Sequence, residues 1–589
     1  MITIKFKILF LLSFYILHST FPIAPIRYVS HTGTSIPPYT TWETAADSIQ
    51  KAINICIDGD TVIVANGVYY ENLVINSTID LIGSSIDSTV IDGRGMADYT
   101  IIFNSGGSIQ NFNIYGKGLG YPATRVIRAY DFLEVRNSTL SEAGVGISII
   151  APYFGANGYF KINNVIIKNT IRGINAGSST QSDTYYISNN LILLQDYNSM
   201  GISLSSAGIF YISNNLILFT ETNNSSLGIY ISPPREVHIY NNLISGFRDN
   251  IFIEIHIDSC NIINNVLLNS ESTSIFSGND DAIIRNNIIM NHRTGIYGWP
   301  VQSDYNLFWE NNVNYHYSNY GDSDIVADPM FVKDTIPNEE LDFDFHLQKY
   351  SPAIDKGNPD ILDVDGTRSD IGMFGGPYGE KYTYKDFAPR TPRNASAIIN
   401  NENQILLRWL RNTEADTSHY NVYRDTILNF TIDSTKLITS ITDTFYVEQI
   451  LPNLSRIVYK ITAVDNQGNE SVPTMDRVVN IVGVDEYEVV PDDYILYHNY
   501  PNPFNPSTSI SYKLKERGYI KLMVYNIKGE LISVLVNEEQ EAGYYEVEFN
   551  VVQDSSPAIA SGIYLYRIEV IGEGNIPRFS DMKKMMLIK

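Results

Sequence analysis

Three ionisable side chains recur at one offset from a repeated asparagine. Arg235, Asp258 and Asp280 each stand six residues before an Asn that opens an aliphatic stretch. If the units of a repeat stack with equal offsets on top of one another, these side chains lie ~4.8 Å apart and could hold a cation or a uronate. In earlier units the same offset is occupied by residues that β-turns also select, namely Ser105, Asp131, Asn157, Asp183 and Gly208. A column of turns is therefore the alternative.

A second candidate site lies in the segment 251–258, IFIEIHID. Side chains alternate along a strand, so the four isoleucines point one way, whereas Phe252, Glu254, His256 and Asp258 point the other way. Three ionisable groups on one exposed face could form a site, and a solvated outer sheet face is the alternative. The candidate catalytic residues are thus Arg235, Glu254, His256, Asp258 and Asp280.

The segment DVDGTRSD (363–370) is the candidate metal-binding loop. It places Asp363, Asp365 and Asp370 around Gly366, and carboxylate oxygens are the ligands that Ca²⁺ prefers. An EF-hand frame would put Ile361 at the first ligand position, so this is not an EF-hand. The alternative is an ion pair between Arg368 and an aspartate. No other cofactor is indicated, and no histidine pair has metal-ligand spacing.

The elements that carry these residues form a repeat. An Asn followed by aliphatic residues recurs in steps of 26, 26, 26, 25, 27, 23 and 22, at Asn111, Asn137, Asn163, Asn189, Asn214, Asn241, Asn264 and Asn286. A second landmark, Gly followed by Ile, recurs at Gly146, Gly173, Gly201, Gly228 and Gly295. Each unit therefore contains at least two short strands rich in β-branched residues.

A unit that carries short strands and advances one strand spacing is a coil of a parallel β-helix. The aliphatic residues then stack as an interior column. Asn suits the corner because it tolerates the left-handed backbone and can hydrogen-bond to the Asn of the next coil. A leucine-rich repeat has a similar period, but its fixed leucine frame is absent.

The first coil needs a cap. The apolar positions Ala45, Ile49, Ala52, Ile53 and Cys56 fall on one helical face and predict a helix within 42–57. From YVSHTGT (28–34) through DGDTVIVANGVYYEN to Gly93, the chain resembles the opening of right-handed parallel β-helix proteins of the pectate-lyase-like superfamily. ADPMFV (327–332), SPAIDKG (351–357) and the segment 363–376 resemble the closing part of secreted bacterial β-helix proteins, and we interpret them as a C-terminal cap. The predicted β-helix domain spans 26–380.

This resemblance implies activity on an extended polysaccharide. Lyases of the superfamily use clustered carboxylates with Ca²⁺ and a basic residue, whereas hydrolases use paired carboxylic acids. Neither arrangement is defined by the sequence beyond the candidates above.

Two further β domains follow. Residues 388–483 resemble a fibronectin type III domain, in which Trp409 packs in the core and Tyr459 forms the tyrosine corner; sugar stacking on Trp409 is the alternative. Residues 494–589 contain NYPNPFNPST, KLMVYNIKGELI and a closing SDMKKMMLIK, and together they resemble the C-terminal sorting domain of the bacterial type 9 secretion system. That resemblance implies an immunoglobulin-like fold and a partnership with outer-membrane secretion machinery.

Composition and the N-terminus bear on location. Lys5 and Lys7 precede about ten apolar residues, a stretch too short to span a bilayer. Residues 1–21 are therefore predicted to be a signal peptide, and an uncleaved anchor is the alternative. The two cysteines, Cys56 and Cys260, have aliphatic neighbours and are expected to be buried thiols. With 41 basic and 65 acidic residues, the formal charge is −24, which disfavours nucleic acid as a partner.

We therefore expect an all-β chain: a right-handed parallel β-helix followed by two Ig-like β-sandwich domains. The leading hypothesis is a secreted or surface-located, monomeric protein that binds a polysaccharide or cell-surface glycan. The alternatives are a polysaccharide lyase or glycoside hydrolase, and an adhesive stalk without a small ligand.

Overall fold

The computed structural model describes residues 25–587 except for short gaps at 96, 120–122, 151–157, 179–181, 222–224, 233, 255–256, 279–281, 299–301, 319, 336, 338–340, 401, 452–453, 482–492, 498, 500–501, 505–506, 551–560 and 573–576. The predicted signal peptide lies outside the described residues. The chain divides into two compact units. The first unit holds the residues up to 383, apart from 221 and 348–351, and the second holds the rest.

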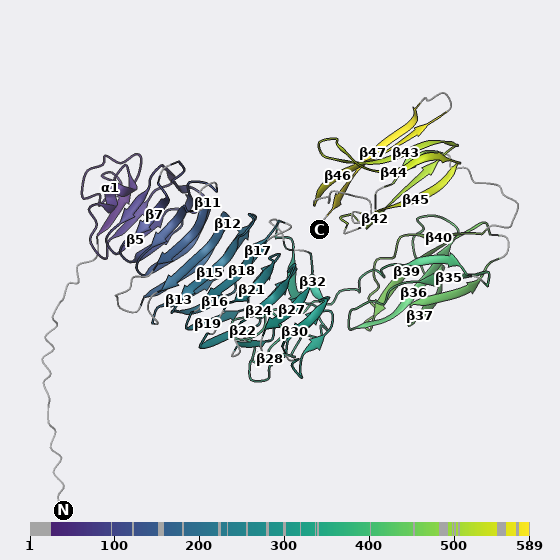
Figure 1. Cartoon of the computed structure of the whole chain (residues 1–589), viewed down its shortest axis with the longest axis horizontal. Helices are drawn as coiled ribbons and strands as arrows, with labels where there is room; N and C mark the ends of the chain where they lie inside the picture. The colour runs from purple at the N-terminus through teal and green to yellow at the C-terminus, as the bar shows by residue number, and fades with distance from the viewer. Residues whose placement is uncertain are drawn as a thin grey trace, which may run out of the picture. The chain divides into compact units, whose positions relative to one another are not determined.

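The first unit is a parallel β-helix, seen in Figure 1 as strands stacked from purple to teal. Strands β1 to β31 pair only in parallel and form three faces. Sheet A contains β1 (Ile26–Val29), β2 (Thr61–Val64), β5 (Ile79–Gly83), β8 (Gly107–Gln110), β13 (Thr184–Ser188), β16 (Ile209–Ser213), β19 (Glu236–Tyr240), β22 (Ser259–Ile263), β25 (Ala282–Arg285) and β28 (Gln302–Asp304). Sheet B contains β3 (Gly67–Tyr69), β6 (Thr89–Asp92), β9 (Asn113–Tyr115), β14 (Leu191–Leu194), β17 (Leu216–Phe219), β20 (Leu243–Ser245), β23 (Val266–Leu268), β26 (Ile288–Met290), β29 (Leu307–Trp309) and β31 (Ile325–Val326). Sheet C contains β4 (Leu73–Ile75), β7 (Tyr99–Phe103), β10 (Arg125–Ala129), β15 (Met200–Ser206), β18 (Leu227–Ser232), β21 (Asp249–Ile253), β24 (Thr273–Ser277), β27 (Thr294–Gly298) and β30 (Val313–His316). Two long strands, β11 (Leu133–Ile150) and β12 (Tyr159–Ser178), bend through all three sheets.

The interior of the β-helix is the predicted aliphatic column. On sheet C one register position is isoleucine in coil after coil, and every one is fully buried: Ile101, Ile127, Ile147, Ile174, Ile202, Ile229, Ile251, Ile275 and Ile296. Burying such side chains stabilises the coils by ~1.5–3 kcal/mol each. The predicted fold class is confirmed.

The asparagine corner behaves as predicted, with one correction. Asn111, Asn137 and Asn189 have φ of 65°, 46° and 56°, in the left-handed region. In the coil between Asn137 and Asn189, however, the left-handed residue is Asn164 (φ 54°), so the choice of Asn163 as landmark was wrong by one position. Asn163 instead pairs in register with Arg136, which leaves its neighbour at the bend.

A second asparagine, directly after the left-handed one, forms the main contact between coils. In each pair the Nδ2 group donates to the Oδ1 atom of the next coil at 2.9–3.0 Å, along Asn190, Asn215, Asn242, Asn265, Asn287 and Asn306. All six side chains are buried. The ladder ends at Asp324, whose carboxylate accepts from the Asn306 backbone at 2.8 Å.

The glycine landmark has a steric cause. A Cβ on Gly201 would lie 2.5 Å from the Gly228 carbonyl oxygen and 2.5 Å from Cγ2 of Ile217. The equivalent atoms crowd Gly173 and Gly228 in the same way. Only glycine therefore lets sheet C approach the interior side chains of sheet B.

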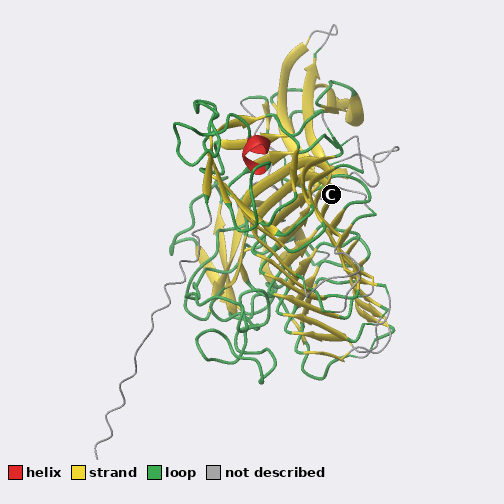
Figure 2. Cartoon of the chain, turned by 90° about the vertical axis from the view of Figure 1, so that its left-hand side faces the viewer, coloured by secondary structure: helices red, strands yellow, loops and turns green. Residues whose placement is uncertain are grey.

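The N-terminal cap is shorter than predicted. Helix α1 (Ile49–Ile53) is the only helix among the described residues, and Figure 2 shows it in red among the strands. It starts at Ile49 because the Glu71 carboxylate accepts the backbone N–H groups of Ile49 and Gln50, at 2.8 and 2.9 Å. The preceding residues form turns, so the expectation of a helix over 42–57 was wrong in length. Ile49 and Ala52 nevertheless pack into the β-helix core, as expected of a cap.

The segment predicted to be the C-terminal cap packs along the side of the coil. Its strands β32 (Phe331–Lys333) and β33 (Asp344–Leu347) pair antiparallel, and with Ala353 and Ile371 they pack on the outer side of sheet B. The packed sheet residues include Leu243, Val266 and Ile288. We call residues 331–376 the flank segment. It lies along several coils because outward apolar residues on sheet B need covering.

The second unit contains two antiparallel sandwiches. The first pairs β34 (Ser396–Ile399), β35 (Gln404–Arg408) and β38 (Phe445–Gln449) in one sheet, and β36 (Thr417–Asp425), β37 (Leu437–Ile441), β39 (Arg456–Asp465) and β40 (Arg477–Asn480) in the other. Trp409 is buried in this core beside Tyr420, which confirms core packing over an exposed stacking platform. The Tyr459 hydroxyl donates to the Glu448 side chain, so the expected tyrosine corner, with its bond to backbone, is not formed.

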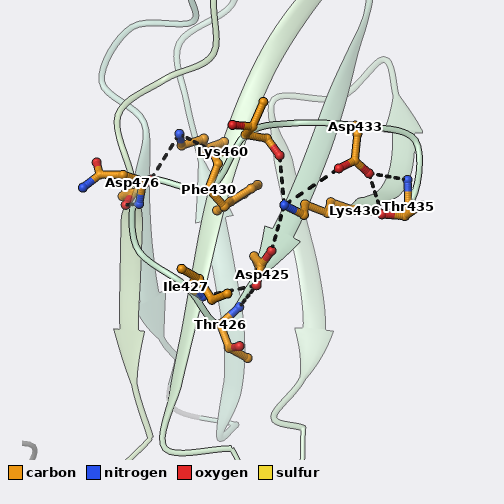
Figure 3. A network of polar contacts seen from close by, with 11 residues as sticks. Asp425, Thr426, Ile427, Phe430, Asp433, Thr435, Lys436, Lys460 and Asp476 are labelled. Atoms are coloured by element: carbon orange, nitrogen blue, oxygen red, sulfur yellow. Dashed lines mark hydrogen bonds and ion pairs between the residues drawn. The ribbon is translucent and has the colours of Figure 1, made fainter.

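A polar network fixes the loop after β36. In Figure 3, Lys436 points to Asp425 and Asp433, and Lys460 points to Asp476, with Phe430 between the two lysines. The lysine nitrogens lie 5.3 and 5.0 Å from the centre of the Phe430 ring. Every acid of this network has a cation partner, which indicates a structural role.

The second sandwich contains one sheet of β41 (Ile495–Leu496), β42 (Ser507–Leu514) and β45 (Gly543–Asn550). The other contains β43 (Gly518–Asn526), β44 (Leu531–Gln540), β46 (Gly562–Ile571) and β47 (Pro577–Leu587). The basic C-terminal segment forms the edge strand β47, with Met585 and Leu587 buried. Among the described helices, none is long and apolar enough to cross a membrane.

Candidate functional site

Covering by the flank segment limits where a ligand can bind. Over its later coils, the outer side of sheet B is packed against Phe331, Phe345 and Ile371. Sheets A and C have no such apolar cover among the described residues. Side chains that contact a ligand are therefore expected on these two faces.

The structure describes two members of the predicted column, Arg235 and Asp258. Glu236 pairs in register with Ser259, so Arg235 and Asp258 occupy equivalent positions just before β19 and β22. Arg235 forms an ion pair with its chain neighbour Glu236, 3.2 Å away. Asp280 lies outside the described residues. The column as a site thus stays a prediction.

The predicted strand face 251–258 is divided between two elements. Strand β21 ends at Ile253 and β22 begins at Ser259, so Glu254 and Asp258 lie in the connection between sheets C and A. Both are exposed, and Glu254 accepts a hydrogen bond from the Tyr230 hydroxyl at 2.5 Å. This bond and one from Ser232 lower the pKa of Glu254. His256 lies outside the described residues.

The candidate metal loop lies in the flank segment. Asp363 accepts the backbone N–H of Asp370 at 3.0 Å, and Asp365 accepts the N–H and hydroxyl of Thr367 at 3.1 and 2.7 Å. Asp370 accepts the N–H of Asp355 at 2.9 Å. The three carboxylates thus hold separate backbone turns. Burial raises the pKa of Asp363.

The expected ion pair between Arg368 and an aspartate is not formed among the described residues. The Arg368 guanidinium donates to the carbonyl oxygens of Gly357 and Lys356, at 2.5 and 3.2 Å. Backbone carbonyls satisfy the guanidinium because the flank segment folds back on itself at this point. Arg368 therefore holds the segment together without a carboxylate.

Three arginines that the sequence did not single out gather on sheet C. Arg125 and Arg128 belong to β10, and Arg172 belongs to β12. Arg125 and Arg172 share a register position with Val145 between them, so their backbones are two coils, or ~9.6 Å, apart. Arg128 pairs with Ser148 on the next coil. All three arginine side chains are half-buried.

These guanidinium groups lack carboxylate partners among the described residues. The Nε atoms of Arg125 and Arg128 and the Oγ atom of Ser148 are buried without a hydrogen-bond partner. Arg128 lies 4.8 Å from the centre of the Tyr130 ring. Burial, followed by the charges of Arg128 and Arg172, lowers the pKa of Arg125. The Arg125 guanidinium donates to the Ala123 carbonyl, and Asp98 is the one acid that interacts with it electrostatically. None of the three arginines forms an ion pair among the described residues, so an anion with oxygen acceptors fits the cluster.

Sheet A carries a cleft of about 230 Å³ near its N-terminal end. Phe132 and Tyr159 stand at its walls, and the carboxylates of Asp80 and Glu134 line it. Ser108 lies between the two acids in register and donates to Asp80 at 2.5 Å. The backbones of Asp80 and Glu134 are therefore ~9.6 Å apart.

Aromatic ladders continue along both faces. On sheet A the rings of Tyr186, Tyr211 and His238 stack at 5.1 and 4.8 Å. On sheet C the column beside the arginines continues as Tyr230, Phe252, Phe276, Tyr297 and His316. Rings inside a ladder turn their faces to one another, so they offer a ligand only their edges. The ladders therefore hold neighbouring coils together. The side chain of Tyr159 is 51% exposed, so its ring is more accessible to a ligand.

The arginine cluster escaped detection because of one insertion. Val145 and Arg172 lie eight residues after Asn137 and Asn164, but Arg125 lies fourteen residues after Asn111. Comparison of equal offsets from the asparagines cannot align Arg125 with Arg172. A search for unpaired basic residues in an acidic chain could have found them.

No protein-family model and no curated protein matches the sequence. Among solved structures, the chain is similar to the spore cortex lytic enzyme SleM of Clostridium perfringens (22% identity, 21% of this chain and 37% of that chain, TM-score 0.14). It is also similar to chicken CNTN1 FN1-FN3 domains (10% identity, 39% of this chain and 76% of that chain, TM-score 0.15). A third similar structure is chitinase ChiA74 from Bacillus thuringiensis (17% identity, 30% of this chain and 28% of that chain, TM-score 0.17). The chain thus spans well under half the length of the two enzymes, and TM-scores this low carry no argument about function.

Proposed function

We propose that this chain binds an extended acidic carbohydrate along sheet C. The observation that carries the proposal is the gathering of Arg125, Arg128 and Arg172 on nearby coils without an ion pair among the described residues. The Nε donors of Arg125 and Arg128 are also buried without a partner. Sugar carboxylates and sulfate esters supply oxygens that accept two guanidinium hydrogen bonds at once. The register column of Arg128 continues with the short polar residues Ser148, Asn175 and Ser203. Asn175 is the half-buried member of these three, whereas Ser148 and Ser203 are buried.

Binding of the full chain to polygalacturonate, alginate and neutral dextran tests this proposal. Isothermal titration should give binding to the acidic glycans only. The double variant Arg125→Gln/Arg128→Gln should weaken that binding at least tenfold, because hydrogen bonds to charged groups contribute ~1.5–3 kcal/mol each.

Arg136→Gln is the matched control. Arg136 is half-buried on sheet A, and its Nε atom is also buried without a partner. It differs from the cluster because its charge is balanced by Glu134, 3.7 Å away. Its replacement should leave binding unchanged. Equal binding to dextran, or a loss only in the Arg136 variant, would refute a site on sheet C.

A second candidate function is hydrolysis of a glycan in the sheet A cleft. Its support is the pair Asp80 and Glu134, which line one cleft from strands two coils apart, with Glu134 ion-paired to Arg136 and Lys161. Inverting glycosidases hold two carboxyl groups ~6.5–9.5 Å apart with a water molecule between them. Incubation of the full chain with the same glycans should then release reducing ends, and Glu134→Gln should abolish the release. An unsaturated product absorbing in the ultraviolet would indicate a lyase instead.

We also propose that the chain is exported to the cell surface through its C-terminal domain. The support is the set of sequence motifs in 494–589 that resemble a type 9 sorting domain. In a bacterium with that pathway, the full chain should reach the surface, and a chain without 580–589 should stay in the periplasm. Surface display of the shortened chain would contradict the proposal.

A further inference from the structure

Three carboxylates from separate segments meet in the first sandwich of the second unit. Asp386 lies in the segment before β34, Asp416 stands directly before β36, and Asp465 is the last residue of β39. One carboxylate oxygen of each lies within 4.8 Å of the other two. The backbone N–H of Asn466 donates to the Asp416 carbonyl at 3.0 Å, which ties two of these segments together.

Asp416 is the member of the cluster that needs an explanation. It is 95% buried, since only 5% of its surface is exposed. Apart from its own N–H, no described residue donates a hydrogen bond to its carboxylate. Asp465 differs, because its oxygens accept from the N–H groups of Gln467 and Asn469, at 2.9 and 2.8 Å. A buried carboxylate whose donor is only its own backbone N–H is costly, so its surroundings point to a missing ligand.

Compensation of the cluster by cations is weak: Lys349 interacts electrostatically with the exposed Asp386. None of Asp386, Asp416 and Asp465 forms an ion pair with a described lysine, arginine or histidine. The nearby Arg390 is paired with Glu414, 4.0 Å away. Burial, followed by the charges of Asp465, Asp386 and Glu414, raises the pKa of Asp416. The acids of Figure 3, by contrast, all have lysine partners.

We propose that Asp386, Asp416 and Asp465 bind a Ca²⁺ ion. Carboxylate oxygens are its preferred ligands, and its flexible coordination suits donors from three separate segments, with carbonyls and water completing the shell. Mg²⁺ demands a near-ideal octahedron and fits such a scattered set less well. The ion would fix the segment 384–395 to the sandwich, since Asp386 belongs to that segment.

Calcium titration of the EDTA-treated full chain tests the proposal. Isothermal titration should show one ion bound per chain, with affinity in the range of extracellular modules, about 0.1–1 mM. Ca²⁺ should raise the melting temperature of the sandwich and slow trypsin cleavage after Lys385. MgCl₂ at equal concentration should do neither.

Two variants and one control make the outcome decisive. Asp386→Asn, at an exposed position, and Asp416→Asn should each weaken Ca²⁺ binding at least tenfold. In EDTA, Asp416→Asn should also melt higher than the natural chain, because an uncompensated buried charge is removed. Asp365→Asn in the flank segment should change nothing. The proposal fails if Ca²⁺ at about 1 mM neither binds nor stabilises the natural chain, or if binding is lost in Asp365→Asn and kept in Asp416→Asn.

Discussion

Replacement of Asn242 by alanine should strongly destabilise the β-helix. The Asn242 Oδ1 atom accepts two hydrogen bonds from Asn215, from its backbone N–H at 3.0 Å and from its Nδ2 group at 2.9 Å. The Asn242 Nδ2 group donates to the carbonyl of Ile212 at 3.0 Å. In the variant, two donors of Asn215 stay buried without an acceptor. Each such group costs ~1–3 kcal/mol, so we expect a loss of about 2–6 kcal/mol in the free energy of unfolding.

Urea unfolding followed by circular dichroism measures this loss. The control is Asn261→Ala, because Asn261 is half-buried on β22 and bonds only to the side chains of His238 and Ser259. Its replacement should cost at most about 1 kcal/mol. If Asn242→Ala also costs less than that, the buried ladder does not stabilise the coils and the reasoning is wrong.

Three further predictions concern the fold. Burial lowers the pKa of His292 to about 4 from 6.5, so the imidazole binds a proton more tightly in the unfolded chain than in the folded one. The contribution of neutral His292 to the free energy of unfolding should be complete above pH 6.5 and fall by about 3 kcal/mol as the pH drops to 4. In acid unfolding, His292→Gln should flatten this pH profile. Gly201→Ala should lower the melting temperature, because the new Cβ would lie 2.5 Å from the Gly228 carbonyl oxygen and 2.5 Å from Cγ2 of Ile217. The control Gly543→Ala should leave the melting temperature unchanged, because its Cβ would meet no atom nearer than 3.6 Å. Cys260 is buried as predicted, whereas Cys56 is only partly buried. Burial raises the pKa of Cys56 to about 11 and of Cys260 to about 12, so Ellman's reagent at pH 8 should label neither thiol rapidly in the folded chain and both in urea. Rapid labelling of Cys260 in the native chain would contradict its burial.

The repeat made much of the fold predictable. An Asn in the left-handed region marks the same corner in eight successive coils, from Asn111 to Asn286. The aliphatic residues between corners predict the buried column. Where two asparagines are neighbours, this reasoning is ambiguous, because the sequence does not show which of Asn163 and Asn164 takes the left-handed backbone conformation. Nor does it show that the second Asn of each pair, such as Asn242, points inward.

Long-range contacts account for the other errors. The start of α1 depends on Glu71, which lies about twenty residues away in the sequence, so helical periodicity alone overestimated its length. The sequence of the flank segment resembles the closing part of β-helix proteins. Its apolar side chains pack on the outward leucines of sheet B, which the sequence of the segment alone does not indicate. The acid cluster of Asp386, Asp416 and Asp465 combines three distant segments and leaves no local motif. Of the residues singled out beforehand, His256 and Asp280 lie outside the described residues, and the others stay candidates.

The flank segment changes how the β-helix should unfold. A stack of coils held only by nearest neighbours can fray from either end, one coil at a time. The flank segment, however, contacts three successive coils. Asn241 donates to the carbonyl of Met373 at 2.8 Å, Asn264 donates to that of Asp370 at 2.8 Å, and Asn286 accepts from the N–H of Asn358 at 2.7 Å. It acts as a strap across the later coils, which must therefore open together. The first half of the solenoid has no such strap among the described residues and should unravel first under mechanical load.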